Sequence, residues 1–174
     1  MLHHRAAHLA VWGNGGGMGF FERVWAGALA GDTPQLDPTL FDSVAVLDSQ
    51  RAETLVASLD IEAAINAHER WKTRLMDYLE GRTPYGLDPA EVRLSNHSAL
   101  GRWVHGVGAD VLGDQPAYPL LVARHAYFHE QAAILVELAQ QGDWGKAVQV
   151  LNGGYRYGSS QVVLMLKELK RGLE

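Results

Sequence analysis

The chain contains eight histidines and no cysteine, so imidazole is the only strong side-chain ligand for a soft metal ion. His125 and His129 are four residues apart. On a helix this spacing places both rings on one face, one turn apart, where a single metal ion can bind both. Ala126 follows His125, so the general base of an HExxH metalloprotease is missing. The pair predicts either a metal site or two core histidines bonded to backbone carbonyls.

His68 is a third candidate ligand. It shares a helical face with Ile61, Ile65 and Leu75, so its imidazole is expected to be buried. A buried imidazole needs a partner, which is either a metal ion or a carbonyl oxygen. We therefore expect His68, His125 and His129 to face inward, and the residues alone leave both explanations open.

The elements that would position these histidines are helices. Apolar spacing predicts a helix that starts after Asp60 and stops at Gly81, a short second helix over 95–105, a long third helix from Pro116 to Gly142, and a last helix from Asp143 to about Lys170. No segment alternates with period two for long enough to form a sheet. The fold class is therefore all-α, resembling a four-helix bundle with a short second helix. Three tryptophans fit helix positions and are expected as core anchors: Trp71, Trp103 and Trp144.

Residues 1–57 are interpreted as an N-terminal arm of unknown role, and residues 58–172 as the helical domain. Within the arm, GNGGGMG (13–19) lacks the glycine spacing of a dinucleotide loop and is read as a linker. Residues 20–30 could form a short amphipathic helix, and a looser helical pattern lies between Phe41 and Leu59. His3, His4 and His8 in the arm are expected to be solvated.

Composition excludes several classes of function. The 174 residues carry 15 Lys and Arg against 20 Asp and Glu, a net charge of −5, which argues against binding nucleic acid through its phosphates. No apolar run reaches the roughly 18 residues that a membrane span requires, and the start does not fit a signal peptide. With 47% hydrophobic and 20% charged residues, the chain is expected to be a folded soluble protein rather than a disordered one.

Four segments together resemble the CZB family, the chemoreceptor zinc-binding domains of bacterial chemoreceptors and diguanylate cyclases. They cover about residues 58–171 and occur in the family's order: AAINAHERWKTRL (63–75), SALGRWVHGVG (98–108), ARHAYFHEQAA (123–133) and GGYRYGSSQVVLMLKEL (153–169). The resemblance implies a cytoplasmic, usually homodimeric helical bundle. It also implies one Zn²⁺ held by three His and one Cys, with His68, His125 and His129 at the histidine positions.

The family's cysteine position is occupied by Ser98, and a serine hydroxyl is a poor zinc ligand. Three outcomes follow: His97 becomes the fourth ligand, a water completes a three-His site, or zinc binds weakly or not at all. We favour a zinc held by three histidines. His97 is kept as the candidate fourth ligand, although it is about 100° away from residue 98 on a continuous helix.

The resemblance implies a zinc-binding regulatory or sensory domain of bacterial signal transduction, of the chemotaxis or cyclic-di-GMP type. It would respond to zinc availability and act through a homodimer or a signalling partner. Because the chain has no thiolate, an oxidation switch at the zinc is not expected. Glu69 and Glu130 are one position off the ligand face, so the chain is not expected to be an enzyme. The alternative is a metal-free helical interaction module whose zinc site has decayed.

Overall fold

A computed structural model describes residues 47–83 and 86–173. All of these residues belong to one compact unit. The predicted linker at 13–19, the predicted helix at 20–30 and the three N-terminal histidines lie outside the described residues. The domain boundary at residue 57 stays a prediction.

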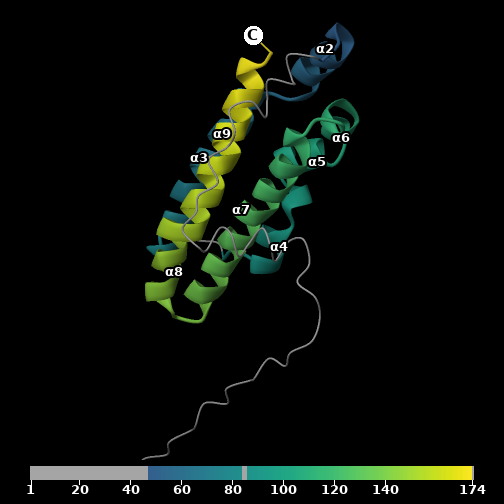
Figure 1. Cartoon of the computed structure of the whole chain (residues 1–174). Helices are drawn as coiled ribbons and strands as arrows, with labels where there is room; N and C mark the ends of the chain where they lie inside the picture. Colours follow the sequence, from purple (N-terminus) through teal and green to yellow (C-terminus); the bar gives the residue numbers. More distant parts are fainter. Residues whose placement is uncertain (1–46, 84–85, 174) are drawn as a thin grey trace, which may run out of the picture. The chain divides into compact units, whose positions relative to one another are not determined.

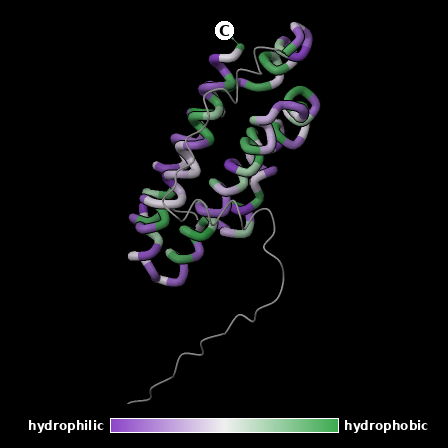
Figure 2. The backbone as a smooth tube through the Cα atoms, viewed as in Figure 1, coloured by the Kyte–Doolittle hydropathy of each residue, from purple (hydrophilic) through white to green (hydrophobic). Residues whose placement is uncertain are grey.

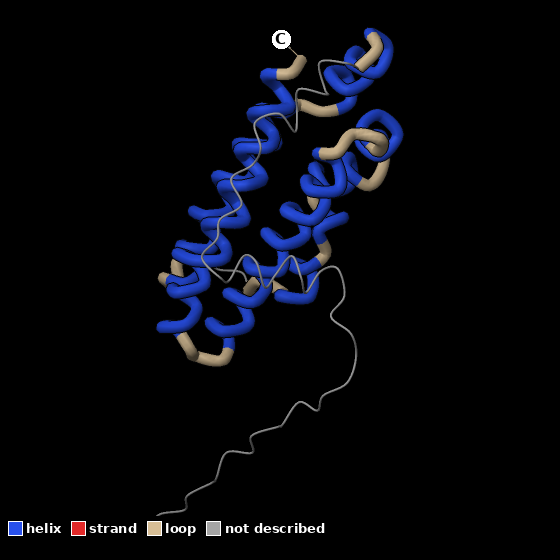
Figure 3. Tube along the Cα trace, in the orientation of Figure 1, coloured by secondary structure: helices blue, strands red, loops and turns tan. Residues whose placement is uncertain are grey.

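The described residues form helices and connecting loops without a strand, which confirms the all-α fold class (Figure 3). The longest helix is α7 (Ala117–Gln140), and it contacts α3 (Ile61–Leu79), α4 (Pro89–Arg93), α8 (Trp144–Val150) and α9 (Arg156–Arg171) (Figure 1). Because neighbours pack on several sides of α7, its buried residues are spread around the helix, from Leu121 and His125 to Gln131 and Ala139. The other long helices, α3 and α9, interleave apolar and polar residues (Figure 2) and pack against each other. No helix in the described ranges combines the length and apolar character that crossing a membrane requires.

The predicted ends of the long helices are confirmed by their capping groups. The carboxylate of Asp60 accepts a hydrogen bond from the Ala63 amide at the start of α3, and Asp143 accepts one from Lys146 at the start of α8. Gly81 and Gly142, which follow α3 and α7, have φ of 67° and 78°. These left-handed conformations suit glycine because it has no Cβ, so both helices end there.

The last predicted helix is a continuous helical segment that consists of three parts. A π-helical turn, η3 (Leu151–Tyr155), joins α8 to α9. Two glycines of this path pack closely against α7: a Cβ on Gly154 of η3 would overlap the Gln131 side chain, and one on Gly158 of α9 would lie 3.2 Å from the Phe128 Cα. Because Gly154 and Gly158 have no side chains, this part of the chain can approach α7 closely.

The predicted second helix is wrong in one respect, because it is not continuous over 95–105. A 3-10 turn, η2 (Ser95–His97), precedes α5 (Ala99–Val104), and Ser98 lies between them in an extended conformation as the N-cap of α5. A serine favours this break because its hydroxyl accepts the Gly101 amide hydrogen bond, at 2.9 Å. Gly101 is required here, since a Cβ would overlap the Ser95 carbonyl. Two further short helices, α4 and α6 (Val107–Leu112), flank this region.

Residues before α3 form α2 (Ser49–Ser58), which packs against α6. Trp103 is buried between them, and its indole donates a hydrogen bond of 2.9 Å to the Ser58 hydroxyl. The prediction that Trp103 anchors the core is therefore confirmed. The same prediction is wrong for Trp144, which is 51% exposed at the first turn of α8, and Trp71 is only half-buried.

Candidate metal centre

Three of the predicted ligands, His68, His125 and His129, lie together in the core. The ring centroids of His68 and His125 are 5.5 Å apart, and those of His125 and His129 are 4.7 Å apart. The first ring comes from α3 and the other two come from α7, one helical turn apart as their spacing predicts. All three side chains are nearly inaccessible to solvent, with 4%, 1% and 4% exposure in chain order.

Hydrogen bonds to the backbone fix the orientation of two of these rings. His68 Nδ1 is 3.0 Å from the Ala64 carbonyl, and His129 Nδ1 is 2.8 Å from the Val92 carbonyl of α4. A carbonyl only accepts, so each Nδ1 carries the hydrogen and each Nε2 keeps its lone pair. Both Nε2 atoms are buried and have no hydrogen-bond partner. Two buried lone pairs without partners are the state in which histidine binds a metal.

The third ring, His125, contacts Ser98. Its Nε2 is 3.2 Å from the Ser98 hydroxyl, which also lies 3.0 Å from the Ser95 carbonyl and accepts the Gly101 amide. The hydroxyl therefore has three neighbours that hold it in the N-cap of α5. This arrangement connects the histidine cluster to the junction between η2 and α5.

Burial keeps the cluster neutral. It lowers the pKa of His125 to about 2, and the neighbouring His129, His68 and His105 also disfavour a charge there. Burial likewise lowers the pKa of His68 and of His129, although their carbonyl partners act in the opposite direction. Metal binding requires neutral imidazole, so the cluster needs no deprotonation at neutral pH.

The donor set fits zinc, which prefers nitrogen from neutral histidine. In the described part of the chain, however, no group of three or more His, Asp or Glu side chains stands as a ready-made metal cage. His125 is close to both other rings, but its Nε2 faces Ser98. The rings would therefore have to move before all three histidines could reach one ion.

The fourth predicted ligand, His97, does not join the cluster. Its side chain is 56% exposed, and its Nδ1 lies 3.2 Å from a carboxylate oxygen of Glu91. The carboxylates next to the cluster in sequence also point elsewhere: Glu69 is exposed, and Glu130 forms a 2.8 Å ion pair with Arg93. The structure thus brings together three of the four predicted ligands.

Other residues that shape the site carry weak sequence signals. Phe128 packs on His68 with 4.7 Å between ring centroids, and the buried Tyr155 packs on Phe128 at 5.2 Å. Their apolar spacing predicts burial but gives no indication of this contact with a histidine. The Val92 carbonyl has no sequence signal, since every residue has a carbonyl. These groups form the layer behind the histidines that holds the rings in place.

The described helices thus bring three buried, neutral imidazoles together in the core. Comparison with protein families finds that residues 68–136 match the chemoreceptor zinc-binding domain, CZB. This segment runs from the first histidine of the cluster past the last, and the match confirms the family resemblance. The motif at 153–169 lies outside the matched residues. No curated protein and no solved structure gives a significant match to the chain.

Proposed function

We propose that this chain is a zinc-binding regulatory domain of bacterial signal transduction, of the chemotaxis or cyclic-di-GMP type. His68, His125 and His129 would hold one Zn²⁺. The observation that supports this most is the pair of buried Nε2 atoms on His68 and His129, each left without a partner while Nδ1 is bonded to a carbonyl. An unpaired buried nitrogen is costly, and a metal ion would offset that cost.

The signal would be zinc availability. When bound, zinc would link α3 to α7 through its histidine ligands. In the structure these two helices make few direct contacts compared with those between α3 and α9. Since the chain contains no cysteine, the oxidation of a zinc-bound thiolate is not open to it. Zinc occupancy would therefore change how strongly α3 is held against α7.

The output would pass through a homodimer or a signalling partner in the cytoplasm. Support comes from large apolar side chains exposed on α8 and α9, where Trp144 is 51% exposed, Val148 46% and Leu164 41%. Contiguous exposed apolar patches mark protein interfaces, and we propose that these side chains contribute to such a contact. Light scattering of the purified chain with and without zinc measures the oligomeric state.

The experiment that tests zinc binding is metal analysis of untagged, chelator-treated protein after adding one equivalent of Zn²⁺. We expect about one zinc per chain, and loss of most of it in His68→Ala and His129→Ala. His105→Ala is the matched control, because that imidazole is exposed at the end of α5. Wild-type protein that retains no zinc, or equal loss in the control, would overturn the proposal. His97→Ala tests the fourth position, and we expect it to keep its zinc.

The second candidate is a metal-free helical interaction module. It is favoured by Ser98, whose hydroxyl is engaged as an N-cap, and by the lack of a ready-made cage among the described side chains. The same experiment separates the two functions, because this module would bind no zinc in any variant.

A further inference from the structure

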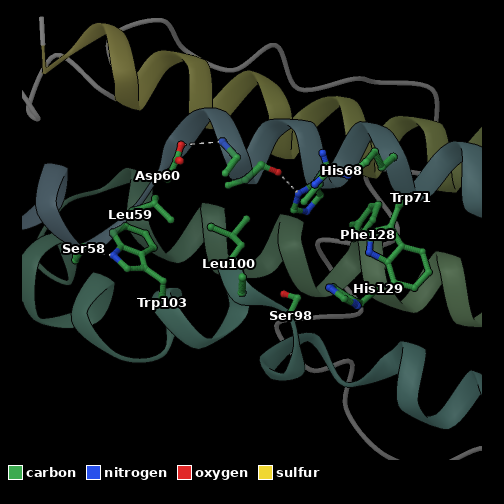
Figure 4. Close-up of a pocket in the computed structure, with 15 residues that line it drawn as sticks. Ser58, Leu59, Asp60, His68, Trp71, Ser98, Leu100, Trp103, Phe128 and His129 are labelled. Carbon is green, nitrogen blue, oxygen red and sulfur yellow. Dashed lines mark hydrogen bonds between the residues drawn. The ribbon is translucent and has the colours of Figure 1, made fainter.

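A cavity of about 390 Å³ is lined by residues of α3, α5 and α7, and none of the functions above uses it. Its wall is mostly apolar. Figure 4 shows three aromatic side chains in the wall: Trp71 of α3, Trp103 of α5 and Phe128 of α7. Two leucines, Leu59 and Leu100, and four alanines complete the apolar part. The composition of this wall is therefore that of a site for an apolar molecule.

The hydroxyl and indole groups of the wall already have hydrogen-bond partners. The Trp103 indole donates to the Ser58 hydroxyl at 2.9 Å. The Ser98 hydroxyl donates to the Ser95 carbonyl and accepts from the Gly101 amide. A molecule in the cavity therefore finds these groups engaged within the protein.

The two histidines of the wall, His68 and His129, also offer no accessible nitrogen lone pair. In each ring Nδ1 is bonded to a backbone carbonyl, and Nε2 is inaccessible to solvent. Since the cavity is space that a small probe can enter, an enclosed Nε2 does not face it. The imidazoles therefore present mainly ring carbon to the cavity, and contact with them requires no metal ion.

A second cavity, of about 410 Å³, adjoins the first, and the two share the side chains of Ala67, Trp71, Ser98, Ala99 and His129. The second wall includes the exposed carboxylates of Asp88 and Glu91. Glu91 lies 3.2 Å from His97, and the Arg74 guanidinium lies 4.8 Å from the centre of the Trp71 ring.

The charged groups of both walls are therefore exposed, and carboxylates outnumber guanidinium groups. The first wall contributes Asp60 and Arg70, and the second contributes Asp88, Glu91 and Arg74. An anion gains nothing from this balance. A cation deep in the first cavity would lose its water and meet no buried carboxylate, which is costly.

We propose that the first cavity binds an uncharged, apolar small molecule about the size of two fused aromatic rings. Apolar pockets of roughly 300–1,000 Å³ are typical of small-molecule sites, and a cavity of about 150 Å³ already accepts benzene. Trp71, Trp103 and Phe128 supply aromatic surface against which such a molecule packs. The second cavity continues from the first and leaves room for a longer apolar substituent. This ligand site goes beyond the proposed function and does not depend on zinc binding.

The test uses the metal-free chain and N-phenyl-1-naphthylamine, an uncharged probe whose fluorescence rises in apolar surroundings. We expect saturable binding and displacement by naphthalene. Two charged compounds with the same rings, 2-naphthoate and 2-naphthylmethylammonium, should compete at least about tenfold more weakly, because each must bury a charge. Absence of saturable probe binding would overturn the inference. Competition by either charged compound equal to that of naphthalene would overturn the uncharged class. Neither result depends on zinc, so metal analysis judges the proposed function separately.

Cavity-filling variants test the location of the probe. Ala67→Leu adds bulk where the two cavities meet, and we expect it to weaken probe binding at least about tenfold. Ala99→Leu makes the same test from an exposed position of α5, and circular dichroism checks that each variant keeps its helices. Ala57→Leu, exposed on α2 and outside both walls, is the matched control and should bind as the wild type does. Equal probe affinity in all three variants would contradict binding in the cavity.

Discussion

The two sides of α7 differ in how they are packed. Toward η3 and α9 the interface is close, because Gly154 and Gly158 lack the side chains that would separate the helices. Leu135, Val136, Leu166 and Leu169 are fully buried in the same core. Toward α3 and α5, His129 of α7 instead lines a cavity of about 390 Å³, while the buried His125 faces Ser98.

This difference separates stability from binding within one helix. Close apolar packing stabilises the bundle through burial and through dispersion contacts. Buried imidazoles with unpaired nitrogens and an adjoining cavity cost stability, and on the packed side the hydroxyls of Tyr155 and Tyr157 are likewise buried without a hydrogen-bond partner. His125 and His129 lie on the same helix as the apolar core residues of α7. Packing of those core residues therefore also fixes the position of the two histidines.

The largest expected effect is on the packed side. Leu166→Ala removes a fully buried side chain from α9, and we expect it to lower the free energy of unfolding by about 3 kcal/mol. Chemical denaturation of metal-free protein measures this change. Leu164→Ala on the same helix is the control, because Leu164 is 41% exposed and its loss should cost much less. Equal effects of the two substitutions would show that α9 does not pack as described.

A second expected effect arises on the binding side and depends on pH. His125 has a pKa of about 2 in the folded chain and an ordinary pKa near 6.5 when unfolded. Between these values the unfolded chain binds a proton that the folded chain does not. The stability contributed by the neutral ring is therefore complete above about pH 6.5 and is lost as the pH falls.

We expect metal-free protein to lose about 2 kcal/mol of stability between pH 6.5 and pH 5 from His125 alone. His68 and His129 act in the same direction, because burial also lowers their pKa values. Denaturation midpoints measured at several pH values test the slope. His125→Gln, which keeps a polar group beside Ser98 but cannot titrate, should flatten it. An unchanged slope in that variant would assign the loss to other groups.

The sequence predicted the features that depend on local signals and missed those that depend on packing between helices. Helix ends at Gly81 and Gly142 were predictable, because a capping residue or glycine gives a strong local signal. Helical periodicity also predicted that His68, His125 and His129 face the core. The break at Ser98 was not predicted, since η2 and α5 together span about the length of one short helix, and a serine there fits a helix interior or an N-cap. Nor could local sequence reveal the Val92 carbonyl or the cavity, because both depend on how α4 and α3 pack against α7.

The smallest expected effect has the opposite sign. His68→Leu replaces a buried ring, whose Nε2 has no partner, with an apolar side chain of similar size. The Ala64 carbonyl that loses the imidazole lies four residues earlier on α3, where the helix itself supplies a hydrogen bond. We therefore expect metal-free protein to gain about 1 kcal/mol of stability, since leaving a buried polar atom unpaired is costly.

The same substitution should abolish the stabilisation that wild-type protein gains from zinc. Thermal denaturation of both proteins with and without Zn²⁺ measures the two effects in one experiment, and His105→Leu on the exposed end of α5 is the control. A gain in the metal-free state together with a loss of the zinc response would show that His68 is kept for binding rather than for folding. A marked loss of stability without metal would instead make His68 part of the packed core, and the distinction between the two sides of α7 would fail.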